Sequence, residues 1–311
     1  MNIYNRKITL EELSKSFGTN KKKFSKKFLT LFKKFNFKYR ILNKNEENFT
    51  LTTIVKNIVI DKVNINSQLR KKIWNKGWLE NLNSFIKKKK LDLLLPKYLD
   101  NKKPKRYLGK FIFPQNKNFE YNYFQLLRQY IFDTYLYKYN HIHEFGCGTG
   151  LNVLSASKNF PNKNIYATDF ANNSIKIVKL ISNLYNKNIT AKLFDIKKPD
   201  YKYVFQKGSV VCTFGSIEQV GSNYKNFLNF IIKKKPQLII NMEPIIDKYK
   251  LTNYMDLLSY IFIKKRGYSS NYLVYLKGLE KENKIRILKI QRTFFGGMMM
   301  DSYNFVIWKI I

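Results

Sequence analysis

The residues best suited to chemistry in this chain lie in one segment, His143 to Gly150, which reads His-Glu-Phe-Gly-Cys-Gly-Thr-Gly. Glycines at alternate positions let the backbone turn sharply and approach a ligand closely, because no Cβ stands in the way. An apolar strand precedes the glycines and a helix follows them, so the free N–H groups at the start of that helix point back at the same spot. Glu144 would repel a pyrophosphate but would suit a ligand that carries an ammonium or sulfonium group. We therefore expect Glu144, Gly146, Gly148 and Gly150 to bind such a ligand.

Two more acids stand at the ends of the next two strands. Asp169 follows the second strand, nineteen positions after Gly150, and a carboxylate at about this spacing bonds ribose hydroxyls. Asp195 follows the third strand, and three successive strands that each end in an acid are hard to explain by chance. A single such Asp is more often a turn or cap residue, and Asp195, two residues before Lys197, retains that alternative.

This arrangement resembles motif I, and the strand ends that follow it, in the class I S-adenosylmethionine (SAM) dependent methyltransferases. The resemblance implies SAM as the cofactor, with Asp169 on its ribose and Asp195 accepting from the adenine amino group. Gly215, directly after the fourth strand, joins the expected cofactor-binding residues.

The acceptor of the methyl group should enter over the fourth and fifth strands, because an open α/β sheet binds its ligands at the carboxyl ends of its strands. Glu218 and Glu243 follow these two strands and are our candidate catalytic residues. A carboxylate with a raised pKa could accept the proton of an acceptor hydroxyl, whereas an amine needs only to bind in its neutral form. Glu218 could equally be a cap or surface acid, and Glu243, before Pro244, a turn residue.

The remaining polar residues favour neither histidine nor metal chemistry. His141 and His143 are the only histidines and lie on one face of the first strand, where we expect them to pack. No group of Asp, Glu and His has the spacing of a metal site, so no metal is expected. Cys147 and Cys212 do not have metal spacing either, and they suggest a reducing compartment.

The elements that must position these residues alternate from residue 141 onward. We expect strands at 141–145, 164–168, 189–194, 209–214 and 237–242, and helices at 150–159, 173–185 and 223–234. Strands that alternate with helices of this length predict an α/β fold with a doubly wound, mostly parallel sheet. Two last strands, 285–291 and 303–310, joined through Phe294 to Gly297, predict a C-terminal antiparallel hairpin and bring the sheet to seven strands. Such a hairpin is usual in the resembled family.

The rest of the chain is expected to cover the site. Residues 1–95 are predicted to be a mainly helical extension, with helices at 10–17, 22–37 and 68–90 and a short strand pair within 49–60. A connector at 96–114 and a helix at 119–137 lead into the methyltransferase domain, 96–311. That domain carries a helical insertion, 244–284, with helices at 251–264 and 269–283. Trp74 and Trp78 should face the packing side, and Tyr268 and Tyr272 should wall the acceptor pocket.

The net positive charge is large, but the types and positions of the basic residues favour nucleic-acid binding less than its magnitude suggests. The net charge is +37, but only eight of the 58 basic residues are Arg, the residue best suited to phosphate and base contacts. The Lys runs are spread along the whole chain, so most should be solvated helix faces, although non-specific binding to polyanions at low salt is expected. No apolar run reaches transmembrane length and no signal peptide is evident, so we expect a cytoplasmic protein without a membrane span.

Several segments within residues 95–311 are similar to a more particular group, the sugar O-methyltransferases of bacteria. They are Phe214 to Gln219, Met242 to Ile245, Arg266 to Tyr268 with Tyr272 and Leu273, and Arg292 through Gly296 to Trp308. The similarity implies methyl transfer to a small-molecule or glycan hydroxyl. An RNA methyltransferase that acts on ribose or base, and a non-catalytic SAM-binding subunit, are the alternatives. The acceptor, the choice between O- and N-methylation, and the oligomeric state are left open.

Overall fold

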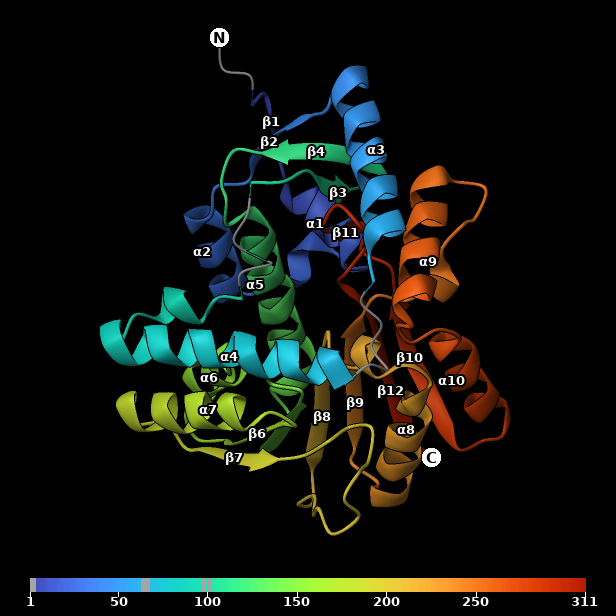
Figure 1. Cartoon of the computed structure of the whole chain (residues 1–311). Helices are drawn as coiled ribbons and strands as arrows, with labels where there is room; N and C mark the ends of the chain where they lie inside the picture. Colours follow the sequence, from blue (N-terminus) through green and yellow to red (C-terminus); the bar gives the residue numbers. More distant parts are fainter. Residues whose placement is uncertain (1–3, 63–67, 97–98, 100–101) are drawn as a thin grey trace.

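The computed structural model describes residues 4–62, 68–96, 99 and 102–311 and contains two sheets (Figure 1). The larger sheet has seven strands in the order β10-β12-β9-β8-β5-β6-β7. The strands β5 (His141–Phe145), β6 (Asn164–Asp169), β7 (Ile189–Leu193), β8 (Ser209–Phe214) and β9 (Leu238–Glu243) are parallel. Strand β12 (Asn304–Ile310) is antiparallel to β9 and to β10 (Ile285–Gln291). The predicted mostly parallel sheet with a C-terminal antiparallel hairpin is therefore confirmed as a mixed seven-stranded sheet.

Helices cover both faces of this sheet, because successive side chains of a buried strand point to opposite faces. Ile142, Cys212 and Ile240 pack into the core that contains α5 (Phe119–Ile131) and α6 (Leu151–Asn159). Phe145, three residues after Ile142 on β5, and Val211, next to Cys212 on β8, pack instead against α8 (Tyr224–Lys234) and α10 (Tyr272–Lys281). The remaining long helix of this half, α7 (Asn172–Leu184), follows β6. The sheet is thus doubly wound, as predicted.

A second sheet of five strands was not predicted. Its order is β1-β2-β4-β3-β11, with β1 (Arg6–Lys7), β2 (Lys38–Ile41), β3 (Lys105–Tyr107), β4 (Lys110–Pro114) and β11 (Phe295–Gly296). The connector predicted at 96–114 supplies β3 and β4, and the supposed hairpin link at 294–297 supplies β11. Phe295 is fully buried and stacks on Tyr123, so the aromatic core draws this link away from the large sheet. The small sheet crosses the domain boundary predicted between residues 95 and 96.

The N-terminal extension is mainly helical, with α1 (Leu10–Ser16), α2 (Lys26–Lys34), α3 (Lys44–Ile60) and α4 (Gln68–Lys88). The helix predicted at 22–37 is shorter than expected, because Ser25 caps α2 at its start. The strand pair predicted within 49–60 was wrong. Asn43 and Glu46 form a capping box that starts α3, and Thr50, Ile54 and Ile58 form one buried face at four-residue spacing. A favourable cap and a buried face outweigh the β-propensity of single residues.

Helix α4 and the insertion close over the large sheet. Trp78, Leu82 and Phe85 of α4 pack against residues of α6 and α7, and Figure 1 shows α4 beside these two helices. The insertion forms α9 (Tyr254–Arg266) and α10, close to the two helices predicted there. Within the part of the chain that the structure describes, no helix combines the length and apolar character that crossing a membrane requires.

His143 is a packing residue, as expected, and its burial predicts a pH-dependent stability. Its ring is fully buried, stacks on Tyr166, and lies 2.9 Å from the Tyr203 hydroxyl and 3.1 Å from the Ser209 hydroxyl. Burial, with smaller contributions from the nearby charges of His141 and Lys192, lowers the pKa of His143 to about 3.

The unfolded chain, with an imidazole pKa of about 6.5, therefore binds this proton before the folded chain does as pH falls. The free energy of unfolding should decline from about pH 6.5 towards pH 3, by up to about 1.4 kcal/mol per pH unit from this group. Urea unfolding of His143→Gln should show a shallower decline, and the half-buried His141→Gln should keep the wild-type slope. Parallel curves for wild type and His143→Gln would contradict this.

Candidate functional site

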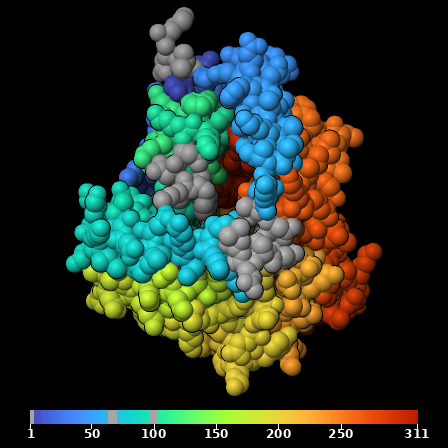
Figure 2. Space-filling view, viewed as in Figure 1, coloured from blue at the N-terminus to red at the C-terminus, as the bar shows by residue number. Residues whose placement is uncertain are grey.

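A cavity of about 760 Å³ lies at the carboxyl ends of β5, β6, β8 and β9. Figure 2 shows its mouth as a hollow bordered by α3 and α4, with the dark red C-terminal segment at its base. The cavity is lined by the glycine segment, by residues that follow β6 to β9, by α4 and α9, and by the segment 297–303. This is the edge of an open α/β sheet at which ligands bind.

The glycine segment forms the turn that the sequence predicted. The amides of Gly146 and Cys147 both donate to the carbonyl of Thr168, at 2.8 and 2.9 Å, and so fold the segment across the end of β6. Gly146, Gly148 and Gly150 have φ of 75°, 54° and 76°, a region that side chains rarely adopt. Neighbouring side chains also leave no room for a Cβ at these positions. A Cβ on Gly146 would lie 2.4 Å from Ser216 Cβ, and one on Gly150 would lie 2.7 Å from Val178 Cγ2. A Cβ on Gly148 would lie 3.1 Å from Trp78 Cζ2.

Glu144 lies behind the cavity wall. Its carboxylate is 2% exposed and accepts a hydrogen bond of 2.9 Å from Asn152 Nδ2, and Arg128 donates to the Oδ1 of Asn152 at 2.8 Å. Burial raises the pKa of Glu144 to about 8, against the lowering effect of Asn152 and Arg128. Asn152 lines the cavity, whereas Glu144 does not. Glu144 therefore contacts the cavity wall only through Asn152, and its own role as a cofactor-binding residue stays a prediction.

Asp169 and Asp195 both line the cavity. The Asp169 carboxylate accepts from the amides of Gly148 and Ala171, each at 2.9 Å, and burial raises its pKa despite these bonds. A carboxylate has about four acceptor positions, so Asp169 can still receive ligand hydroxyls. Asp195 accepts from the Lys197 amide at 2.9 Å, which is the turn bond that its alternative interpretation implied, and it also forms an ion pair of 2.9 Å with Lys71.

Helix α4 supplies a wall that the sequence indicated only through its tryptophans. Trp74 and Trp78 stack at 5.2 Å between ring centroids, and both line the cavity. Arg70 lies over the Trp74 ring and donates to Gln219 Oε1 at 2.7 Å and to the Tyr268 hydroxyl at 3.2 Å. The roles of Arg70 and Lys71 were missed, because nothing in a basic helix marks which cations meet residues more than a hundred positions away.

Glu218 and Glu243 lie close together, but only Glu218 lines the cavity. Glu243 accepts from the amides of Ser216 and Glu218, at 3.2 and 3.1 Å, so it holds the loop after β8 in place. Glu218 accepts from Gln219 Nε2 at 2.6 Å through one oxygen, and its other oxygen is buried without a hydrogen-bond partner. Burial, and then the neighbouring charge of Glu243, raise the pKa of Glu218 to about 8. The catalytic role of Glu243 stays a prediction.

The acceptor side of the cavity differs in part from expectation. Tyr268 lines it, but Tyr272 does not, because its hydroxyl donates to Asn241 Oδ1 at 2.6 Å in the interior. The expectation that Tyr272 walls the pocket was wrong. Other lining residues were not among the predicted site residues: Lys105, Glu120, Phe124 and Met298 to Met300. The consecutive methionines were the one visible signal among them.

Among the described residues, no group of three or more His, Cys, Asp or Glu side chains is arranged to hold a metal ion. Cys147 and Cys212 are both buried and unpaired thiols.

Comparison with known proteins gives structural likeness only. No family model matches the chain, and no curated protein matches its sequence. Among solved structures it is similar to PigF with SAH (S-adenosylhomocysteine), with 13% identity and a TM-score of 0.43 over 61% of this chain and 59% of that chain. The chain thus spans less than two thirds of the length of PigF.

Two further structures show similar likeness. The plantazolicin methyltransferase BpumL, in complex with a monoazolic desmethylPZN analog and SAH, has 14% identity and a TM-score of 0.40 over 58% of this chain and 79% of that chain. Magnesium protoporphyrin IX methyltransferase (ChlM) from Synechocystis PCC 6803, with bound SAM, has 10% identity and a TM-score of 0.40 over 55% and 69%. At these identities the function must be inferred from the residues of this chain.

Gly215 offers a direct test of where a ligand lies. Its φ is +70°, it lines the cavity, and no protein atom lies within 4 Å of a Cβ placed on it. Gly109, in the exposed turn between β3 and β4, has φ of +77° and equally open surroundings, but it does not line the cavity. The two positions therefore form a matched pair.

Gly215→Ala and Gly109→Ala should each cost about 1 kcal/mol of stability through backbone strain. Only Gly215→Ala should weaken SAH binding in calorimetry, by roughly tenfold or about 1.4 kcal/mol, because its methyl group enters the cavity. Equal SAH affinity in the two variants would show that the cofactor does not approach Gly215.

Proposed function

We propose that this protein is a SAM-dependent methyltransferase that transfers a methyl group to a hydroxyl of a small molecule, with Glu218 as the general base. One observation carries the proposal. Glu218, which has a buried carboxylate oxygen without a hydrogen-bond partner, lines the same cavity as the glycine segment and Asp169. A cofactor site and a base with a raised pKa, together at the carboxyl ends of parallel strands, suit a group transfer that excludes water.

The residues present fit SAM. Gly215 leaves open space in front of its backbone, and the left-handed glycine turn aims the start of α6 at the cavity. Asp169 retains acceptor capacity for ribose hydroxyls. Asp195 lies at the end of the same wall, beside Phe170 and Ile196, which provide apolar surface for a flat ring. Asn152, oriented by Glu144 and Arg128, faces the cavity next to the glycine segment.

When bound, SAM supplies a sulfonium methyl group, and a hydroxyl oxygen that bonds to the methyl carbon displaces sulfur with its electron pair, leaving SAH. Glu218 would take the hydroxyl proton, because one of its carboxylate oxygens has no hydrogen-bond partner and its raised pKa favours the protonated product state. The neighbouring Glu243 fixes the Glu218 amide and, by its charge, raises the pKa of the Glu218 carboxyl further.

Arg70 acts as a positioning residue for this base. Its guanidinium holds Gln219 Oε1, and the amide nitrogen of the same Gln219 holds Glu218 Oε1. The positive charge of Arg70 also lowers the pKa of Glu218, against the larger effects of burial and of Glu243. Helix α4 of the N-terminal region would therefore complete the active site besides covering it.

The proposal is tested by incubating the protein with methyl-labelled SAM and a metabolite extract, with glycans and total RNA as parallel acceptors. Label should pass to a small molecule with release of SAH, and the turnover should be insensitive to salt. Label confined to RNA, with a steep loss of affinity as salt rises, would show that the acceptor class is wrong. SAH binding without any transfer would favour a non-catalytic subunit.

The pH dependence follows from Glu218. The base must be deprotonated to act, so kcat/KM should rise about tenfold per pH unit below pH 8 and level off above it. Glu218→Gln should lower the rate by roughly 10²-fold or more, with a flat pH profile and SAH affinity near wild type. Glu11→Gln, at a largely exposed acid, should leave the profile unchanged. An unaltered profile in Glu218→Gln would remove Glu218 as the base.

Arg70→Met should move the midpoint of that profile to higher pH, since a charge that lowers the pKa of Glu218 is removed. It should also lower kcat more than it raises KM for the acceptor. Arg286→Met, at an exposed position on β10, is the matched control and should move neither quantity. A lower kcat in Arg70→Met without any change in the midpoint would leave Arg70 a merely structural role.

A further inference from the structure

The part of the cavity away from the glycine segment has apolar walls. We call it the acceptor chamber and define it by Phe124, Met242, Phe262 and the consecutive Met298, Met299 and Met300, all of which line the cavity. These residues come from α5, β9, α9 and the segment after β11. They meet on the side of β8 where β9 and β12 lie, and the cofactor-side strands β5, β6 and β7 lie on the other side.

The charged groups beside the chamber are already paired. Lys105 Nζ lies 2.6 Å from Glu120 Oε2, with side chains 2% and 6% exposed, and the Tyr303 hydroxyl donates to Glu120 Oε1 at 3.0 Å. Arg266 forms an ion pair of 2.5 Å with Asp61. Among the described residues that line the cavity, Glu218 is the carboxylate left with a buried, unpartnered oxygen.

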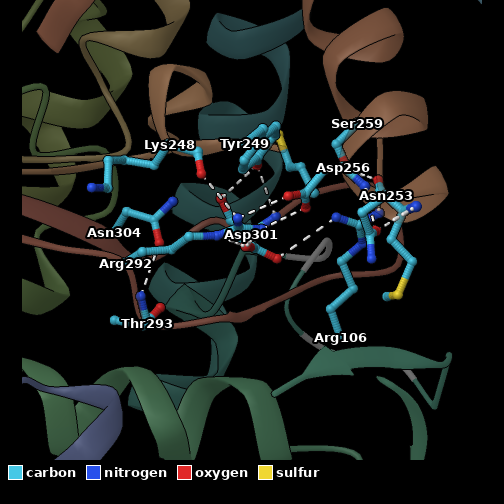
Figure 3. A network of polar contacts seen from close by, with 12 residues as sticks. Arg106, Lys248, Tyr249, Asn253, Asp256, Ser259, Arg292, Thr293, Asp301 and Asn304 are labelled. Atoms are coloured by element: carbon cyan, nitrogen blue, oxygen red, sulfur yellow. Dashed lines mark hydrogen bonds and ion pairs between the residues drawn. The ribbon is translucent and has the colours of Figure 1, made fainter. Parts of the chain in front are cut away.

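A network of ion pairs and hydrogen bonds around Asp301, the residue that follows the methionines, fixes the methionine segment; Figure 3 shows the network. Arg292 lies between two buried acids, 2.8 Å from Asp256 Oδ2 and 2.7 Å from Asp301 Oδ2. Burial alone would raise the pKa of Asp256, but the bonds from Arg292 and the Lys250 amide hold that pKa below its ordinary value. Asp301 also faces Arg106 of β3 at 3.6 Å.

Further bonds fix the backbone on either side of Asp301. Ser259 of α9 donates to the Met299 carbonyl at 2.9 Å, and the Ser302 amide donates to the Phe295 carbonyl at 3.1 Å. The Asp301 amide donates to the Tyr249 hydroxyl at 3.2 Å. The backbone of the methionine segment is thus fixed by the ion-pair network and by α9, and its side chains supply an adaptable apolar wall.

We propose that the acceptor is a small molecule with an apolar, alkyl or aromatic body and one hydroxyl at the end that meets Glu218. This rests on the proposed function and narrows its acceptor class. A sugar would place several hydroxyls against methionine and phenylalanine side chains. The nearby charged groups already bond one another, so these hydroxyls would lose their hydrogen bonds to water without gaining new ones, which disfavours binding. An apolar body loses no such bonds and is driven into the chamber by the hydrophobic effect. The sugar acceptor expected from the sequence is therefore disfavoured.

The experiment compares two sets of hydroxyl compounds by calorimetry and thermal shift, with the full chain both free and loaded with SAH. The first set, 1-naphthol, 4-hexylphenol and 1-decanol, has apolar bodies. The second set, methyl glucoside, methyl galactoside and uridine, has polar ones. At least one member of the first set should bind at least tenfold more tightly than every member of the second. A polar compound that binds as tightly, or the absence of binding by all three apolar compounds, would overturn the proposal.

Two variants connect the result to the chamber. Met298→Gln and Met300→Gln keep the side-chain length and add a polar amide. Each should therefore lower the affinity for the best apolar probe by roughly five- to tenfold. Leu288→Gln, at a half-exposed position on β10 outside the cavity, should leave its affinity unchanged. Unchanged affinity in both methionine variants, with folding intact, would place the probe elsewhere and overturn the proposal.

SAH binding separates this inference from the proposed function. If the protein fails to bind SAH, the proposed methyltransferase is wrong, and the probes measured on the SAH-free chain still decide whether the chamber selects apolar compounds. If SAH binds and labelled methyl groups pass only to sugars, the proposed function stands and the apolar acceptor is wrong.

Discussion

Paired charges inside the protein determine the shape of its cavity. Lys105 with Glu120, and Arg292 with Asp256 and Asp301, are almost wholly removed from water. Breaking a buried pair by removing one partner typically costs about 3–5 kcal/mol, because the other charge is left uncompensated. The segments that carry these charges, β3, α5, α9 and the C-terminal loop, are therefore held in one arrangement. The walls of the acceptor chamber are the surface that this arrangement leaves open.

The two ends of the cavity have different chemistry because different kinds of structure form them. The cofactor end is formed by strand ends and turns, which present acids and a glycine-rich backbone without further support. The acceptor chamber is formed by side chains that reach it from four separate elements, and their polar neighbours bond one another. Glu218 lines the cavity and keeps one carboxylate oxygen without a hydrogen-bond partner, whereas Glu243 uses both of its oxygens to hold the intervening loop.

The N-terminal region contributes part of the cavity wall. Lys71 reaches Asp195 at the adenine end that the sequence predicted, and Arg70 reaches Gln219 beside the proposed base. Trp78 lies on Gly148, so the helix contacts the glycine segment itself. Two neighbouring cations of one helix thus contact both ends of the cavity. The strands β1 and β2, which lie in one sheet with β11, tie the beginning of the chain to its C-terminal segment.

Local sequence was sufficient for the alternating half of the fold and for the cofactor end of the site. Hydrophobic runs of strand length, the glycines and an acid at each strand end are properties of short windows, and parallel strands bring their carboxyl ends to one edge. That logic placed Asp169, Gly215 and Glu218 at the cavity, but it could not show that Glu144 and Glu243 lie behind its wall. The capping box that starts α3 is also a property of four consecutive residues, and it outweighs the β-propensity of the β-branched residues that follow it.

The second sheet, the cations of α4 and the apolar chamber were decided only by the tertiary structure. Strand β3 pairs with β11 although about 190 residues separate them, and Lys71 meets Asp195 across 124 positions. Such contacts leave no mark in a single sequence, because a lysine that will be paired is the same residue as one that will face water. Which polar groups find partners, and so which walls stay apolar, depends on distances that exist only after the chain has folded.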